Sequence, residues 1–231
     1  MDFDLYTGFA PLLLYPGPGT DATLAACTER LRARDAALAA EFAPFARAFA
    51  ALDRRQREEL FLKTFEVQAL CHLELGYVLF GEDYKRGLFL ANMKEEQERA
   101  GLDGGIELAD HLANVLCLLP RLDDEDLVRD LAEQALIPAL RTMLEGFDDA
   151  RIRARIDALH RKHKAVLLEE LNFGSPYSHL LRTILGLFEA DFPGVEPRRA
   201  ARSDFIPIQD TREASGGCAM FRPGAGLGEG A

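Results

Sequence analysis

Apolar residues recur at intervals of three and four through most of the first 192 residues, and no convincing alternation of apolar and polar residues interrupts them. A period near 3.6 residues is typical of an amphipathic α-helix, whereas a half-buried strand has a period of two. The spacing therefore predicts an all-α fold. We expect a single bundle of about seven helices, formed by one domain over residues 1–192.

Turn residues and helix caps divide this pattern into segments. After the Pro-Gly repeat at 16–19, an Ala-rich helix is expected from about residue 20 to Leu52, broken before Pro44. A central helix is expected over 58–80, because apolar residues recur there at helical spacing. The next helix is expected over roughly 82–100.

Four further helices complete the prediction. One begins near Leu108 and ends before Pro120, and another runs from residue 123 to 144 with a kink at Pro138. A sixth apolar stripe covers 152–167. Ser175 and Pro176 then form a good N-cap and first-turn pair for a final helix, whose apolar face is Leu180, Leu181, Ile184 and Phe188.

The composition changes after residue 192. Residues 193–231 contain seven glycines and four prolines, and their few apolar residues follow no helical period. Such a segment does not bury enough apolar surface to offset the entropy of ordering it. We expect an extended or disordered C-terminal tail, which could still lie along the bundle or engage a partner.

The charge balance narrows the choice of partners. The chain has 27 basic and 38 acidic residues, a net charge of −11. This charge opposes binding to nucleic acid or to an anionic membrane surface and favours a basic partner. The N-terminus has no basic segment followed by an apolar run, and no window approaches eighteen uncharged apolar residues. A soluble, cytoplasmic protein without stable membrane insertion is expected.

Few residues have the spacing that catalysis or metal binding requires. His160 and His163 lack the carboxylate of a Glu-x-x-His pair, and neither "GPGTD" nor "LDGGIE" has the context of a phosphate-binding loop. No cofactor, metal or enzymatic activity is therefore expected. A helical metalloenzyme, which needs convergent ligands, and a small-molecule-binding helical regulator, which needs an apolar cavity, remain as alternatives. The cysteines are widely spaced and suit buried packing in a reducing compartment: Cys27, Cys71, Cys117 and Cys218.

A charged elbow, "VLFGEDYKRGLFL", joins two apolar helical patterns at residues 78–90. Gly81 suits the left-handed position at the end of one helix, and Glu82 and Asp83 suit the positive end of the next. Two interpretations remain open. The elbow is either a rim that orients a peptide partner, with apolar contact from Phe80 and Tyr84, or an ordinary solvated helix start.

Three segments together resemble a known family. They are "FLKTFEVQALCHLELGYVLFGEDYKRGLFLANMKEEQERAG" at 61–101, "ELADHLANVLCLLPRL" at 107–122 and "SPYSHLLRTIL" at 175–185, with a weaker match at "LLLYPG". In order and spacing they are similar to the nitrate reductase delta-subunit (TorD/NarJ-like) family of molybdoenzyme assembly chaperones. Ala109 stands where proline is common in that family.

The resemblance implies an all-helical, cofactor-free chaperone in the cytoplasm. Its partner would be the apo catalytic subunit of a molybdenum-containing reductase or dehydrogenase of the DMSO-reductase family, including that subunit's basic N-terminal or signal segment. The chaperone would hold the subunit for insertion of the bis-pterin molybdenum cofactor, before assembly or twin-arginine export.

The candidates for contact with this client all lie in the three matching segments. They are Phe65, Glu66, Phe80, Glu82, Asp83, Tyr84, Arg86, Glu107, Asp110, His111 and Tyr177. Asp110 and His111 are expected in the first turn of their helix, where the dipole favours a carboxylate and disfavours a protonated imidazole. His111 is therefore expected to be neutral near pH 7. The alternative is that Asp110 only stabilises the helix start.

Overall fold

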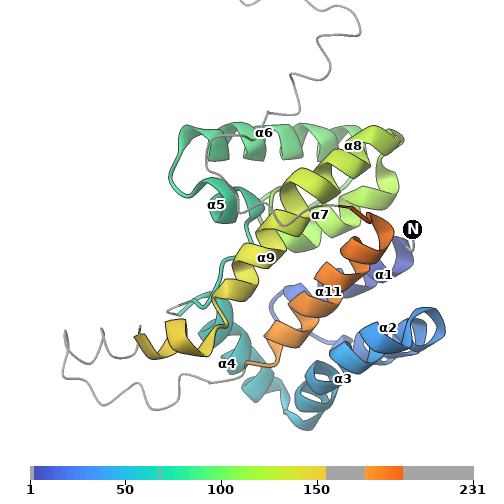
Figure 1. The fold of residues 1–231 in the computed structure, drawn as a ribbon, viewed down its shortest axis with the longest axis vertical. Helices are drawn as coiled ribbons and strands as arrows, with labels where there is room; N and C mark the ends of the chain where they lie inside the picture. Colours follow the sequence, from blue (N-terminus) through green and yellow to red (C-terminus); the bar gives the residue numbers. More distant parts are fainter. Residues whose placement is uncertain (1–2, 68, 155–174, 195–231) are drawn as a thin grey trace, which may run out of the picture.

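The computed structural model describes residues 3–67, 69–154 and 175–194. Ten α-helices have both ends within these residues, and the only β geometry there is an isolated antiparallel bridge between Glu74 and His111. The predicted all-α bundle is confirmed (Figure 1). The structure has more helices than the expected seven, because three of the expected helices each form two and α1 was not expected.

The helical elements are short and follow one another closely along the chain. In order they are α1 (Phe3–Phe9), η1 (Ala10–Leu13), α2 (Thr20–Arg34), α3 (Ala36–Ala51), α4 (Arg54–Phe65), α5 (Leu75–Phe80), α6 (Tyr84–Arg99), α7 (Leu112–Leu118), η2 (Leu119–Arg121), α8 (Glu125–Asp130), η3 (Leu131–Leu136), α9 (Ile137–Glu145) and α11 (Tyr177–Asp191).

The Ala-rich segment breaks at Asp35, so the expected break before Pro44 was wrong. Asp35 has an extended backbone, and its Oδ1 accepts hydrogen bonds from the amides of Ala37 and Leu38 at 2.7 and 3.0 Å. These bonds satisfy the first free amides of α3, which is the function of an N-cap. Pro44 lies inside α3, where the packing of that helix against α11 outweighs the amide hydrogen bond that proline lacks.

The expected central helix over 58–80 was also wrong, because the chain leaves the helix between α4 and α5. The amide of Leu75 donates to the carbonyl of Asp110 at 2.9 Å, and the amide of Leu112 donates to the carbonyl of Leu73 at 2.8 Å. Backbone groups that a helix would pair locally are thus paired with a segment far along the sequence. A tertiary contact has overridden the helical period.

Helix α7 begins at Leu112, four residues after the expected start. The carbonyls of Glu107 and Leu108 accept hydrogen bonds from the side-chain amide of Asn114 at 3.3 and 2.9 Å, which holds this segment in a turn. Asp110 and His111 therefore precede the first turn of α7, and the prediction that they belong to it was wrong. His111 is the N-cap residue.

The elbow and the Pro138 region follow the prediction. Gly81 ends α5 with φ of 63°, a conformation that favours glycine, and α6 begins three residues later. Between α8 and α9, element η3 is a π-helical stretch that ends at Leu136, two residues before Pro138. Proline cannot donate an amide hydrogen bond and displaces the carbonyl four residues earlier, so an irregular turn there is the expected kink.

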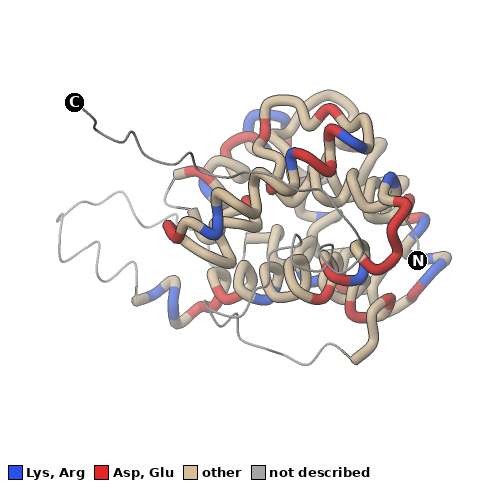
Figure 2. Tube along the Cα trace, turned by 90° about the horizontal axis from the view of Figure 1, so that it is seen from above, with Lys and Arg blue, Asp and Glu red and all other residues tan. Residues whose placement is uncertain are grey.

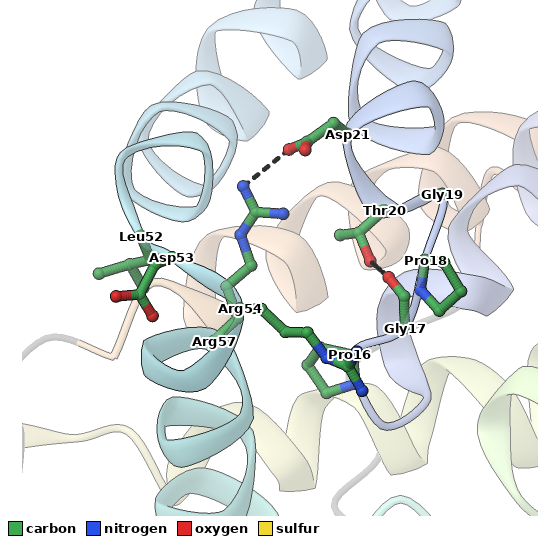
Figure 3. A pocket seen from close by; sticks show the side chains of 10 residues that line it. All are labelled: Pro16, Gly17, Pro18, Gly19, Thr20, Asp21, Leu52, Asp53, Arg54 and Arg57. Carbon is green, nitrogen blue, oxygen red and sulfur yellow. Dashed lines mark hydrogen bonds and ion pairs between the residues drawn. The ribbon is translucent and has the colours of Figure 1, made fainter.

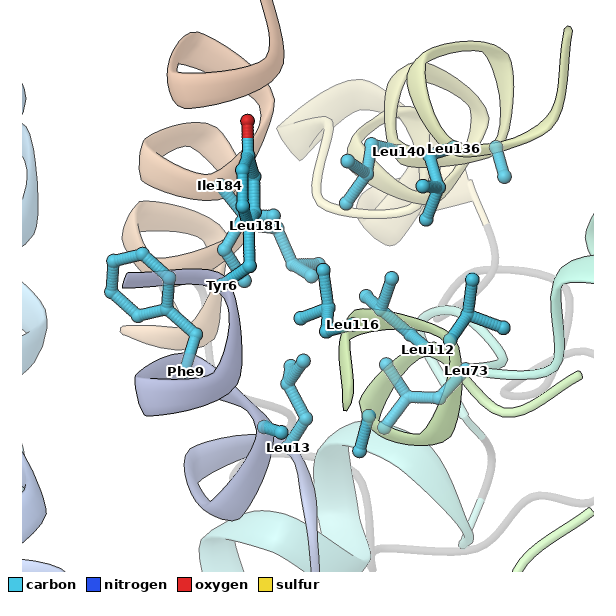
Figure 4. Packing of buried hydrophobic residues seen from close by; sticks show 14 of the residues in the cluster. Tyr6, Phe9, Leu13, Leu73, Leu112, Leu116, Leu136, Leu140, Leu181 and Ile184 are labelled. Carbon is cyan, nitrogen blue, oxygen red and sulfur yellow. The ribbon is translucent and has the colours of Figure 1, made fainter. Parts of the chain in front are cut away.

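Helix α11 lies at the centre of the core and packs on both α3 and α9. Figure 4 shows Leu181 and Ile184 of this helix pointing toward Tyr6 of α1 and Leu116 of α7. The four apolar residues predicted for the face of α11 are fully buried. Burying an aliphatic or aromatic side chain of this size contributes about 1.5 to 3 kcal/mol, so this contact is a major source of stability.

Polar side chains from other segments contact residues at both ends of α11. The hydroxyl of Ser175 lies 3.1 Å from the hydroxyl of Thr64 and makes no capping bond, so the predicted Ser175 cap was wrong. At the other end, Asp191 accepts a hydrogen bond from the Tyr6 hydroxyl at 2.9 Å and pairs with Arg34. Helices α1 and α2 are thereby tied to the last turn of α11.

Several predictions fall on residues outside the described ranges. These are most of the stripe over 152–167 with its two histidines, the tail from residue 195, and Cys218. Ile152, the first residue of that stripe, is buried. Among the helices that the structure describes, none is both long enough and apolar enough to cross a membrane.

Candidate functional site

The pairing of residues 73–75 with 110–112 places Asp110 against the start of α5. The amide of Gly76 donates to Oδ2 of Asp110 at 3.0 Å. A β-carbon at position 76 would lie 2.7 Å from that same oxygen, so only glycine fits without displacement. The Asp110 carboxylate thus contacts the backbone of α5 directly.

Asp110 is fully buried, and its second oxygen, Oδ1, has no hydrogen-bond partner among the described residues. Burial raises the pKa of the Asp110 carboxyl. The Gly76 amide, the Asp110 amide and the Arg86 guanidinium act to lower this pKa, while the Glu74 carboxylate raises it. The carboxyl is therefore in an energetically unfavourable position for its charged form.

His111 is nearly fully buried beside Asp110 and caps α7. Its Nδ1 accepts a hydrogen bond from the amide of Ala113 at 3.2 Å, so the neutral ring carries its proton on Nε2. Burial lowers the pKa of His111, although the charge of Glu74 opposes this. The direction agrees with the expected neutral imidazole. Its main cause is burial, where the sequence had indicated the helix dipole.

Glu66, Glu74 and Glu107 are here called the acidic cluster, because the charges of Glu74 and Glu66 act on Glu107. Burial raises the pKa of Glu107, and the charges of Glu74 and Glu66 raise it further. None of the three carboxylates forms an ion pair with another described residue. The described trace has a second acidic run at residues 123–126, and elsewhere acidic and basic positions are mostly interspersed (Figure 2). The cluster is therefore a local concentration of uncompensated negative charge.

Exposed apolar side chains adjoin the acidic cluster. Val67, next to Glu66, is 61% exposed, and Ile106, next to Glu107, is 98% exposed. A single exposed apolar residue is ordinary, but two beside three carboxylates form a mixed surface of the kind that binds a basic, partly apolar segment. We call this surface, made of Glu66, Val67, Glu74, Ile106 and Glu107, the acidic docking surface.

The charged elbow is mainly a helix start. Oδ1 of Asp83 caps α6 by accepting from the amide of Lys85 at 3.0 Å. Glu82 and Tyr84 project outward, with 84% of the Glu82 side chain and 74% of Tyr84 exposed. Arg86 lies over the ring of Tyr77 at 5.0 Å and 3.8 Å from Glu82. The elbow therefore leaves Glu82 and Tyr84 open to a partner, while Asp83 has a structural function.

Five candidate contacts are buried: Asp110, His111 and three aromatic residues. Phe65, Phe80 and Tyr177 expose at most 5% of their surface. Tyr177 packs edge-on against Phe65, and its hydroxyl has no hydrogen-bond partner among the described residues. These five side chains cannot touch a client in this conformation, so their direct contact is not supported. The three aromatic residues belong to the apolar core behind the candidate site.

Sequence reasoning found two of the three glutamates but missed Glu74. The expected helix over 58–80 hid its position, since only the pairing with residues 110–112 brings it to Glu107. Gly76 was the available signal: a glycine inside an apolar helical pattern can mark close approach of another segment. Here the approaching group is the Asp110 carboxylate.

A pocket of about 350 Å³ is lined by the "PGPG" turn and by the starts of α2 and α4 (Figure 3). Arg57 points to Asp21, with 2.7 Å between Nη2 and Oδ1, and its Nε donates to the carbonyl of Phe49 at 2.8 Å. Arg54 pairs with Glu58 at 2.8 Å. Both cations are thus paired, and the pocket is not the apolar cavity that a small-molecule regulator needs.

Cysteines in the described region behave as packed side chains. Cys27 and Cys71 are buried, and Cys117 is partly buried. Burial raises the pKa of the Cys27 thiol to about 12, which keeps it protonated and unreactive. Within the described ranges, no three His, Cys, Asp or Glu residues are placed to hold a metal ion.

Fold and site together define an all-α protein with a mixed acidic and apolar surface where two distant segments pair. Comparison of the chain with protein-family models gave no match, and comparison with curated proteins gave none.

Proposed function

We propose that this protein is a cytoplasmic chaperone for the apo catalytic subunit of a molybdenum-containing reductase or dehydrogenase. It holds the subunit open for insertion of the bis-pterin cofactor and binds the subunit's basic, partly apolar N-terminal segment. The proposal is supported by the resemblance over residues 61–101, 107–122 and 175–185.

The acidic docking surface is the observation that carries this proposal. It combines two candidates from separate matching segments, Glu66 and Glu107, with exposed Val67 and Ile106. Negative charge speeds the encounter with a basic segment and makes it sensitive to salt, while apolar contact supplies the lasting affinity. Glu82, which precedes α6, and Tyr84, the first residue of α6, offer a second contact of the same character.

Capture of the client from the native host tests the proposal. The full-length protein, tagged and expressed at its natural level, is purified gently and its partners are identified by mass spectrometry. We expect an apo molybdenum-enzyme catalytic subunit to be enriched, and enrichment should fall as salt rises. A variant with Glu66, Glu74 and Glu107 changed to Gln should lose the client.

The matched control changes three exposed glutamates elsewhere, Glu29, Glu98 and Glu125, to Gln and should retain the client. Both variants remove the same charge, so a difference between them locates the contact. Recovery of no molybdenum enzyme with the wild-type protein would refute the proposed function.

A further inference from the structure

The outer side of α6 carries apolar side chains that the described bundle leaves exposed. Phe89 and Met93 bury the inner side of this helix, which lies at an edge of the described fold (Figure 1). On the outer side, Tyr84 is 74% exposed and Leu88 is 43% exposed. Residues four apart on a helix project in nearly the same direction, so these two side chains form one apolar patch. Such a patch indicates an interaction surface.

Two small residues continue this patch along the helix. Gly87 and Ala91 follow Tyr84 at helical spacing, and both are exposed. A β-carbon on Gly87 would meet no neighbouring segment within 4 Å, so the space above this residue is open. Small residues let a second helix approach closely and leave room for large side chains of that helix. We call Tyr84, Gly87, Leu88 and Ala91 the α6 outer face.

The α6 outer face is complementary to a second copy of itself in an antiparallel arrangement. A two-fold axis that passes between residues 87 and 88 places Tyr84 of one copy opposite Ala91 of the other. The same axis places Leu88 of one copy opposite Gly87 of the other. Each large side chain therefore meets a small one, which allows two helices to interdigitate. The shape of this face thus fits a second copy of the chain.

Opposite charges flank the α6 outer face in the order that this arrangement requires. Glu82 precedes α6 and Lys94 lies in its second half, with 84% and 72% of their side chains exposed. Both are equally far from Leu88 in the sequence, so an antiparallel contact brings Glu82 of one copy beside Lys94 of the other at both ends. Their ion pairs within the chain are long, 3.8 Å to Arg86 and 3.9 Å to Glu98. Such exposed pairs are weak, so both charges can turn to a partner that matches them.

We infer that the α6 outer face is the interface of a reversible, antiparallel homodimer. Each copy contributes one helix, so we expect the interface to bury less than the roughly 1,200 to 2,000 Å² of stable complexes. Monomer and dimer therefore exchange, and their ratio depends on protein concentration. The inference goes beyond the proposed function and does not rest on it. It requires only that Glu82 and Tyr84 contact a client in the monomer, because the dimer covers them.

Analytical ultracentrifugation of the full chain under reducing conditions tests for the dimer. Between roughly 5 and 500 µM, the average mass should rise from that of the monomer toward that of the dimer. Leu88→Lys keeps a good helix former and brings two like charges to the centre of the contact, so the dissociation constant should rise at least about tenfold. The matched control is Leu62→Lys on α4, where the replaced leucine is 37% exposed, and it should leave the constant unchanged.

A charge exchange then tests the antiparallel register. Glu82→Lys and Lys94→Glu each place like charges together at both ends of the dimer, so each variant alone should dimerise at least about fivefold more weakly than wild type. An equimolar mixture of the two variants should recover the wild-type dissociation constant, because opposite charges again face each other in the mixed dimer. A parallel contact would place each residue beside its own copy, and the single variants would then dimerise as wild type does.

Unfolding midpoints separate a lost interface from a lost fold. Each variant, as a monomer at low concentration, should unfold within about 3 °C of wild type. A wild-type chain that stays monomeric over the whole concentration range would overturn the inference and leave the α6 outer face to another segment or another protein. Equal effects of Leu88→Lys and Leu62→Lys would overturn it as well, and so would a mixture of the charge variants that fails to associate. None of these measurements involves the client, so this inference and the proposed function can fail separately.

Discussion

Replacing Gly76 with alanine tests the packing behind the acidic docking surface. The new β-carbon would lie 2.7 Å from Oδ2 of Asp110 and 3.2 Å from Cδ1 of Phe89. Overpacking of this kind costs about 1 to 3 kcal/mol, and the displaced hydrogen bond to a carboxylate adds about 1.5 to 3 kcal/mol. The higher helix propensity of alanine offsets about 1 kcal/mol of this loss in unfolding free energy. The net loss in unfolding free energy should be roughly 1.5 to 5 kcal/mol.

Gly87→Ala is the matched control, because it makes the same chemical change inside a helix. Gly87 is exposed on α6, and a β-carbon there would meet nothing within 4 Å. Helix propensity alone should then raise the unfolding free energy by about 0.5 to 1 kcal/mol. Urea unfolding followed by circular dichroism measures both variants.

A double-mutant cycle identifies the group that Gly76 accommodates. In an Asp110→Ser background the shorter side chain leaves room for the β-carbon, so Gly76→Ala should cost at least about 1 kcal/mol less than in wild type. If Gly76→Ala is as stable as wild type, or if its cost is the same in both backgrounds, Asp110 does not lie where the structure places it.

Three further perturbations follow from buried or charged contacts. Tyr177→Phe removes a buried hydroxyl that lacks a partner among the described residues, so it should raise the unfolding free energy by about 1 kcal/mol; a loss of that size would contradict the burial. Asp191→Asn breaks the pair with Arg34 and should cost roughly 1 to 3 kcal/mol, since both side chains are largely buried; an unchanged urea midpoint would show that the pair contributes nothing. The raised pKa of Glu107 means that the folded state binds more protons than the unfolded state above pH 4.5, so this residue lowers stability as pH rises through its folded pKa. Glu107→Gln should therefore gain stability relative to wild type above pH 4.5 and not below it, and a pH-independent difference would refute the repulsion.

Local sequence patterns correctly predicted the start of α6 and the buried face of α11. Gly81 and the acidic residues after it correctly marked the start of α6, and the apolar spacing of Leu180 and Ile184 gave the buried face of α11. These features depend on backbone conformation and on the 3.6-residue period. Both can be read within one turn of helix.

Long-range pairing was beyond local patterns. The chain leaves the helix after Phe65, and residues 73–75 then form backbone hydrogen bonds with 110–112. The spacing of apolar residues within one segment cannot predict a pairing with such a distant segment. The break at Asp35 was missed for another reason. A single carboxylate that can cap a helix is a weaker sequence signal than a proline, so the break was expected at Pro44 instead. Glu74 was overlooked with the same pairing, since its position beside Glu107 exists only in the folded chain.

Molybdenum content of the client in a strain that lacks this protein tests the central claim most directly. The client is the catalytic subunit captured by the wild-type protein, purified from deletion and parent strains and assayed for molybdenum and pterin per polypeptide. We predict that the subunit is present in the deletion strain but lacks cofactor, and that the wild-type gene restores loading while the Glu66, Glu74 and Glu107 triple variant does not. A fully loaded client in the deletion strain would contradict the chaperone function.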